Sequence, residues 1–245
     1  MKGRLYLAIL VCMGGCAHKE PPPPETAAPP PVARPAPQPA PADDASDELK
    51  VQGTLGTLAD EEVSGPFQRR WDDITNCYQH AQAKLWYLGG KIEVHVKIGK
   101  TGEPKTAYVS SSTFGNWEAE RCVVDIARQL TFSRPHGGSE AEFSYPIEFR
   151  SRSAIVTWDE ARVAPSIARH KHDVTACKGK AQNGLPPTMT MTLWVAPGGK
   201  VTSAGFAADA PVDTQLAECL VAKARGWRLD DPLGKIAKAT VGVRE

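Results

Sequence analysis

The feature that most limits how this chain can fold is an internal repeat. Residues 90–132 align with residues 187–229 at a constant offset of 97. Upstream, residues 72–82 match residues 172–182 at an offset of 100, because three residues are lost from the loop that follows. The aligned pairs include Gly102 with Gly199 and Cys122 with Cys219. A chain with two copies of one unit is expected to form the same structure twice.

The first copy predicts the order helix, strand, strand, helix, strand. Apolar residues at helical spacing predict a first helix begun by Ser64 and Pro66, and its stripe is Phe67, Trp71, Ile74, Tyr78, Ala81 and Leu85. Apolar and polar residues alternate over 92–98, which is typical of a half-buried strand. A turn, a second strand over 105–112, a helix capped near Asn116 and a last strand over 143–149 follow. Pro146 lacks an N–H, so we expect this last strand at a sheet edge.

This order predicts an α+β fold of two tandem small domains. Each domain is expected to hold a three-stranded antiparallel sheet with two helices on one face. The first domain would span residues 51–152 and the second, diverged one residues 153–245.

Cysteine spacing agrees with the repeat. Four cysteines lie beyond the amino-terminal region: Cys77, Cys122, Cys177 and Cys219. In an exported protein an even number indicates disulfides, with three possible connectivities. The simplest pairs Cys77 with Cys122 and Cys177 with Cys219, one bridge in each domain, each joining its two helices.

Residues 1–15 have the form of a lipoprotein signal peptide. Lys2 and Arg4 precede an apolar run that is too short to span a bilayer. Two glycines then precede Cys16, and this segment resembles a bacterial lipobox. Met13, three residues before the expected cleavage site, is unusual at that position. We expect lipidation at Cys16; the alternative is a plain secretory signal with this cysteine incidental. Ala17 favours sorting to the outer membrane, with the protein facing the periplasm.

Residues 16–50 are expected to form a disordered tether rich in proline and alanine. Eleven of the 21 prolines of the chain fall between positions 21 and 41. Such a composition buries too little apolar surface to fold, so it would hold a folded head away from the membrane. The alternatives are a neutral linker and a ligand for a proline-binding domain.

The first copy carries a family resemblance. The segments "GGKIEVHVKIGKTGEPKTAYVSSSTFGN", "ERCVVDIARQLTFSRP" and "EFSYPIEF" resemble the TonB carboxy-terminal domain family. Within it they are similar to the AgmX/PglI-type carboxy-terminal domain of myxobacterial-type envelope lipoproteins. The resemblance covers about residues 53–150; over 154–245 only the cysteines, the strand alternation, "PGGKV" and the helix around Cys219 match. It implies a protein-binding module that captures an extended peptide as an added strand. Unlike TonB, this chain has a lipobox in place of an amino-terminal membrane helix, which favours a passive adaptor.

Charge and side-chain chemistry offer little for catalysis. The net charge is +1 and the charges are interspersed, so nothing indicates a nucleic-acid partner. Cysteines held in disulfides cannot act as nucleophiles. His170 and His172 have no acidic third ligand beside them, so we interpret them as a solvated helix face and not a metal site. The acidic run from Asp60 to Glu62 fits the start of a helix. We therefore expect no enzyme activity, no metal and no cofactor.

Two functional hypotheses follow. The first is a lipid-anchored adaptor that binds an envelope protein by strand addition, along the last strand of either copy. The residues expected to line these strands are Phe143, Tyr145, Ile147 and Phe149 in the first copy and Ile236, Lys238 and Thr240 in the second. Alternatively, the two copies pair edge to edge and hide both strands. The second hypothesis is a structural envelope protein that binds peptidoglycan or supports an outer-membrane motility or secretion assembly.

Overall fold

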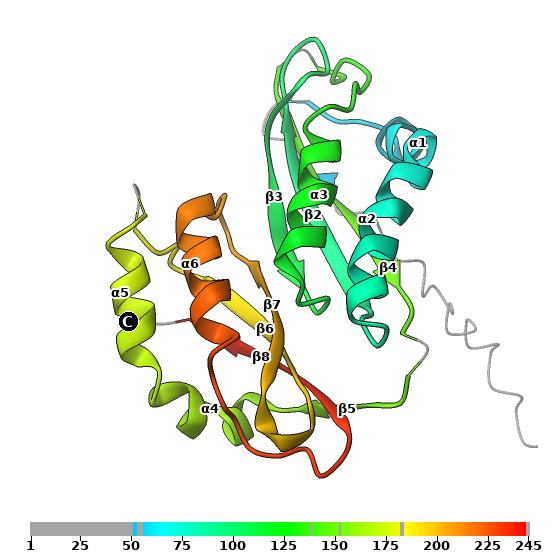
Figure 1. The fold of residues 1–245 in the computed structure, drawn as a ribbon. Helices are drawn as coiled ribbons and strands as arrows, with labels where there is room; N and C mark the ends of the chain where they lie inside the picture. The colour runs from blue at the N-terminus through cyan, green and yellow to red at the C-terminus, as the bar shows by residue number, and fades with distance from the viewer. Residues whose placement is uncertain (1–50, 53–55, 138, 152, 182–183, 244–245) are drawn as a thin grey trace, which may run out of the picture. The chain divides into compact units, whose positions relative to one another are not determined.

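The computed structural model describes residues 51–52, 56–137, 139–151, 153–181 and 184–243. The expected signal peptide, the lipidation site Cys16 and the expected tether lie outside these residues. Across the described ranges, no helix has both the length and the apolar character needed to cross a membrane. Within these residues the fold is α+β, with two four-stranded sheets and six α-helices (Figure 1).

The first repeat forms a sheet with the strand order β1-β4-β2-β3, all neighbours antiparallel. Its strands are β1 (Val51–Gln52), β2 (Gly90–Ile98), β3 (Pro104–Ser112) and β4 (Ala141–Phe149). Its helices are α1 (Asp60–Arg69), α2 (Trp71–Lys84) and α3 (Trp117–Ala127), and α2 and α3 lie side by side on one face of the sheet (Figure 1).

The second repeat forms a sheet with the order β5-β8-β6-β7. Its strands are β5 (Ile155–Trp158), β6 (Thr190–Val195), β7 (Val201–Ala207) and β8 (Ile236–Gly242), and a short 3₁₀ turn, η1 (Pro197–Gly199), joins β6 to β7. Its helices are α4 (Glu160–Ala168), α5 (Lys171–Lys178) and α6 (Thr214–Ala224). Each sheet thus contains the expected antiparallel three-stranded set plus one short strand that the sequence does not predict. The added strand β5 runs parallel to β8.

The first helix differs from its prediction. It begins at Asp60 and not near Ser64, and Pro66 lies inside it. The acidic first turn explains the earlier start, because the Glu62 carboxylate accepts a hydrogen bond from the Ala59 N–H at 2.9 Å and stabilises the positive helix end. The helix then breaks at Arg70 and α2 starts at Trp71. As a result Trp71, which the sequence places in the buried stripe, is 41% exposed.

The core follows the predicted alternation. Ile92, Val94, Val96 and Ile98 are all fully buried beneath the helices. The structure confirms both disulfides: Cys77 with Cys122 joins α2 to α3, and Cys177 with Cys219 joins α5 to α6. Residues 46–245 form one compact unit, so the division into two domains near residue 152 stays a prediction.

Candidate partner-binding edge

The outer edge of β4 is paired over only part of its length. On its inner side β4 pairs with β2 from Ala141 to Phe149, whereas on its outer side the described chain pairs only Glu142 and Phe143, with β1. The outer edge from residue 144 to residue 149 therefore has no neighbouring strand within the described residues. Unpaired backbone groups in such an edge can accept another extended chain.

Pro146 shows which backbone groups point outward. In an antiparallel ladder, opposite residues alternate between pairs that exchange hydrogen bonds and pairs that do not. Pro146 lies opposite Glu93 and has no N–H, so we assign this pair to the second kind. Ser144 and Glu148, two residues to either side, then turn their N–H and C=O groups outward. The expectation that this strand lies at a sheet edge holds only in part: β4 lies between β1 and β2, and only beyond its pairing with β1 is its outer side unpaired among the described residues.

The side chains expected to line β4 do not all face this edge. Phe143, Ile147 and Phe149 are buried in the core of the first repeat. Tyr145 is half-buried, and its ring stacks on Phe67 of α1 with the centroids 4.0 Å apart. A partner on this edge would therefore contact the backbone of β4, the Tyr145 side chain and the polar side chains of Ser144 and Glu148.

The corresponding edge in the second repeat is covered over most of its length. β5 pairs with β8 from Ile236 to Ala239, and the Gly242 N–H donates a hydrogen bond to Glu160 Oε1 at 3.2 Å. The sequence predicts that this edge is open, which is wrong over residues 236–239. The prediction fails because nothing in residues 155–158 distinguishes a strand from a connection between the repeats.

The three residues expected to line β8 are engaged within the chain. Lys238 donates from Nζ to the Gly89 carbonyl at 3.1 Å and lies over the Trp194 ring; burial lowers its pKa. Thr240 shares a hydrogen bond of 2.8 Å with the Thr192 hydroxyl. Ile236 is half-buried and packs against the core of the first repeat.

The other long edges, β3 and β7, meet at a seam between the two repeats. The alternative in which the last strands of the two copies pair edge to edge is wrong, because β4 and β8 lie in separate sheets. At the seam between β3 and β7, the Ala208 N–H donates to the Val109 carbonyl at 3.0 Å. Most other hydrogen bonds across the seam involve side chains. They run from Trp194 Nε1 to Phe114 O (2.7 Å), Ser203 Oγ to Gly115 O (2.7 Å), Thr192 Oγ1 to Ser112 O (2.9 Å), Asn116 Nδ2 to Ser203 Oγ (3.0 Å) and Tyr87 Oη to Thr202 Oγ1 (2.7 Å).

Glu120 is the central residue of this seam. Its carboxylate is fully buried and accepts hydrogen bonds from Ser112 Oγ at 2.6 Å, Gly115 N at 3.1 Å and Phe206 N at 2.9 Å. Burial raises the pKa of Glu120 to about 6, and these hydrogen bonds limit the rise. Gly205 leaves room for it, because a side chain there would collide with both carboxylate oxygens. The sequence does not single out Glu120. It is one of two acidic residues in the first turn of α3, where acidic residues are usually exposed, so nothing in the sequence indicates that it is buried.

A cavity of about 260 Å³ opens beside the seam. Its walls include Tyr108, Trp117, Val124 and Phe206. The charged residues that line the cavity already have partners: Arg121 binds Glu218 at 2.9 Å, Arg128 binds Asp125 at 3.1 Å, and Glu120 accepts the hydrogen bonds described above. None of these paired charges is therefore free to bind a charged ligand in the cavity.

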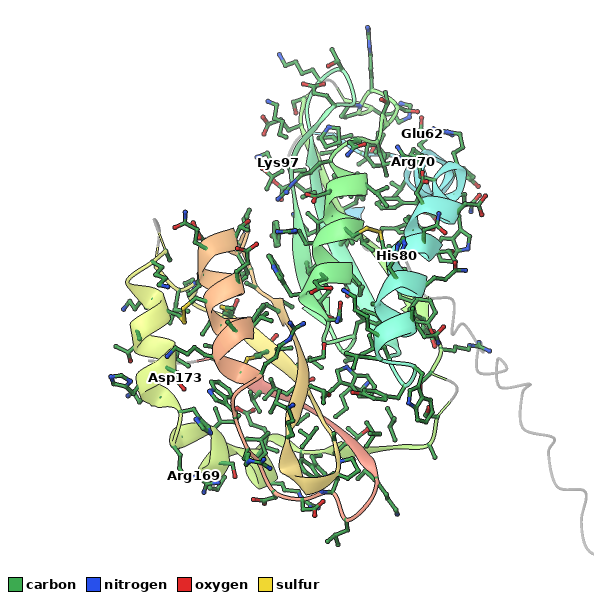
Figure 2. All side chains as sticks on the ribbon, in the orientation of Figure 1. Glu62, Arg70, His80, Lys97, Arg169 and Asp173 are labelled. Atoms are coloured by element: carbon green, nitrogen blue, oxygen red, sulfur yellow. A yellow bond between two sulfur atoms is a disulfide. The ribbon has the colours of Figure 1, made fainter. Side chains whose placement is uncertain are left out.

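The open face of the first sheet is charged. Lys97 binds Glu140 at 2.7 Å and Glu142 at 3.3 Å, on the side of the sheet away from Glu62 of α1 and from Arg70, which lies between α1 and α2 (Figure 2). Lys105 binds Glu140 as well, at 2.7 Å, and the two lysines lower the pKa of Glu140 to about 2. This exposed network keeps the sheet face solvated beside the β4 edge.

The histidine pair is not a uniformly solvated helix face. His172 is exposed as expected, but His170 is half-buried, and its ring stacks on Trp227 with the centroids 4.6 Å apart. Asp173 lies 3.7 Å from His170 Nδ1 and accepts a hydrogen bond from Trp227 Nε1 at 2.9 Å. Throughout the part of the chain that the structure describes, no three His, Cys, Asp or Glu side chains gather as a metal site would require.

Comparison of the chain with protein-family models, with curated proteins and with solved structures gives no match.

Proposed function

We propose that this protein is a lipid-anchored adaptor of the bacterial envelope that binds a partner protein by strand addition along the outer edge of β4. Lipidation at Cys16 would hold it on the outer membrane facing the periplasm, and residues 16–50 would act as the tether. The two repeats would be TonB-type carboxy-terminal domains, the second one diverged. The observation that carries the proposal is the six-residue stretch 144–149, which is unpaired on its outer side among the described residues.

The edge of β4 suits one extended peptide. Two outward N–H donors, at Ser144 and Glu148, flank the position of Pro146, and their spacing matches the alternation of an antiparallel or parallel partner. The missing donor at Pro146 limits indiscriminate pairing, which is how natural sheets protect an open edge. The stacked rings of Tyr145 and Phe67 lie on the helix side of this edge and favour an apolar side chain in the partner.

The rest of the chain favours this edge over the others. The outward side of β8 is covered by β5 and Glu160, and β3 packs against β7 at the seam. The remaining strand at an edge of the second sheet, β5, has only four residues. Short edge strands offer few hydrogen bonds to another chain.

A matched pair of variants tests the proposal. Ser144→Pro removes one outward N–H, whereas Ser144→Ala keeps it and loses only the hydroxyl contact to His95 Nδ1 at 3.4 Å. Pull-down from detergent-solubilised envelope should recover a protein partner with the wild type and with Ser144→Ala, and recovery should fall at least tenfold with Ser144→Pro. Equal recovery with both variants, when thermal unfolding shows both to be folded, would contradict strand addition at β4.

A further inference from the structure

Two of the exposed large apolar side chains lie at the two ends of one helix, α2. Among the described residues, the large hydrophobic side chains that are exposed are Trp71 (41%), Trp86 (64%) and Leu233 (84%). Trp71 begins α2 and Trp86 follows its last residue by two positions. Tryptophan is costly to leave in water, and when it recurs on one surface it marks a binding site more often than chance exposure does.

The two tryptophans lie at opposite ends of α2, and an outward stripe of the helix lies between them. At 100° per residue, Trp71, Gln82, Thr75, Gln79 and Ala83 lie within about 120° of the helix circumference, and Asp72 is the charged residue among them. Trp86 lies just beyond the end of the helix, because the backbone of Leu85 at the C-cap is not helical. We call the following set the α2 stripe: Trp71, Thr75, Gln79, Gln82, Ala83 and Trp86. The helix beneath it is about 20 Å long at 1.5 Å per residue.

A shallow hollow lies at the carboxyl end of the stripe. Gln79, Gln82, Ala83 and Trp86 line it, and its volume is about 400 Å³. Gln82 donates from Nε2 to Tyr78 Oη at 2.6 Å, which fixes the plane of its amide. The ring of Trp86 stands edge to face on Tyr87 with the centroids 5.8 Å apart.

The platform under the hollow is rigid. The disulfide from Cys77 ties α2 to α3, and Tyr87 donates from Oη to Thr202 Oγ1 across the seam at 2.7 Å. A site whose side chains are held in place before binding loses less conformational entropy when a ligand arrives.

The chemistry of the hollow selects a class of ligand. Its lining holds no charged group and only one large apolar side chain, so it lacks both the charges that would attract an ion and the continuous apolar area of a protein-docking core. An exposed indole with two neighbouring amides suits a neutral sugar ring. The C–H face of the sugar packs on the indole, and the amides donate to and accept from its hydroxyl or acetamido groups.

We propose that the α2 stripe binds a glycan strand of neutral amino sugars, with one ring stacked on Trp86 and the strand running along α2 toward Trp71. The site is distinct from the β4 edge. Only the choice of peptidoglycan as the natural glycan rests on the proposed envelope location.

The test is co-sedimentation of the mature full-length chain, kept in mild detergent, with purified sacculi, with a β-1,4-linked N-acetylglucosamine tetramer as soluble competitor. The wild type should sediment and the tetramer should displace it. Trp86→Ala should weaken the apparent affinity at least tenfold, Trp86→Phe should retain most of it, and Gln79→Ala should weaken it several-fold. Leu233→Ala removes an even more exposed apolar side chain elsewhere and should have no effect.

Three results would overturn the proposal. The first is a wild type that neither sediments with sacculi nor binds the tetramer. The second is a folded Trp86→Ala variant that sediments as the wild type does. The third is a Trp86→Ala variant that loses a protein partner but keeps the glycan, which would make the stripe a protein-docking surface. Ser144→Pro should leave sedimentation unchanged, so failure at the β4 edge and failure at the α2 stripe are distinguishable.

Discussion

Glu120 Oε2 accepts a hydrogen bond of 2.9 Å from the backbone N–H of Phe206, so a carboxylate of the first repeat is bound by a strand of the second. The group is fully buried and its remaining hydrogen bonds come from its own repeat, at Ser112 and Gly115. A buried charge satisfied in this way makes the packing of the two repeats specific, because any shift of β7 would leave the carboxylate short of a donor.

Glu120 should make the stability of the protein depend on pH. Its pKa is about 6 in the folded protein against 4.5 ordinarily, so between these values the folded state binds more protons than the unfolded state. The stabilising contribution is therefore full below pH 4.5 and is lost as the pH rises through 6, by about 2 kcal/mol for a shift of this size. Urea unfolding measured from pH 4.5 to pH 7.5 reports it.

Glu120→Gln supplies the control for that measurement. Burial lowers the pKa of both His95 and His170, and these two histidines give a slope of opposite sign near the same pH. Comparing wild type and variant at each pH removes their contribution. The glutamine cannot accept from all three donors, so it should be destabilising at every pH, and the loss should be larger at pH 4.5 than at pH 7.5. A loss that does not change with pH would show that Glu120 does not titrate in this range.

Gly205→Ala should destabilise the seam. A Cβ at this position would approach the Asn116 backbone nitrogen to 2.6 Å and collide with the Glu120 carboxylate, so β7 or α3 must shift. We expect a loss of about 1–3 kcal/mol in the free energy of unfolding. Gly179→Ala is the matched control, since its Cβ would have only the Ala176 carbonyl nearby, at 3.8 Å, and the backbone there is helical. It should be neutral or stabilising by up to about 1 kcal/mol.

The parts of the fold that the sequence predicts are those that a short stretch of residues specifies by its own pattern. The alternation from Ile92 to Ile98 and the cysteine spacing specify a strand and two bridges, and the structure has both. The parallel pairing of β5 leaves no local pattern, because four residues cannot show a period. The role of Glu120 was equally hidden, since its partner Phe206 lies 86 residues away and is placed there only by the packing of two sheets.

Of the two prolines used to predict secondary structure, Pro66 gave a wrong helix start and Pro146 gave a partly correct strand position. Pro66 reads as the start of a helix, yet three acidic residues before it stabilise an earlier start and the helix tolerates the proline within it. Pro146 predicts an edge strand. β4 lies between β1 and β2, but its outer side is unpaired at Pro146 among the described residues. The difference is that acidic residues at a helix start compensate for the proline, whereas nothing in a sheet replaces a missing ladder donor.

Loss of the first disulfide should be costly. Cys77 and Cys122 close a loop of 45 residues between α2 and α3, and replacing both by serine should lower the free energy of unfolding by about 2–5 kcal/mol. Non-reducing peptide mapping should find Cys77 linked to Cys122 and Cys177 linked to Cys219. A bridge between Cys77 and Cys177 would refute the pairing within each repeat.

The proposed lipid anchor is testable by one substitution. Cys16→Ser should leave the protein unprocessed or release it from the membrane, because the apolar run before it is too short to span a bilayer. Fractionation of cells, with metabolic labelling by a palmitate analogue, gives both readouts. A variant that stays in the outer membrane to the wild-type extent would disprove lipidation at this residue.

Amide hydrogen exchange along β4 tests strand addition most directly. The protein is measured alone and with the partner recovered by pull-down, on peptides spanning residues 141–149 and on peptides from β3 and β8. Strand addition predicts that exchange of the Ser144 and Glu148 amides slows at least tenfold on binding while β3 and β8 stay unchanged. Unchanged exchange in 141–149, with protection appearing instead on α2 or at the seam, would contradict it.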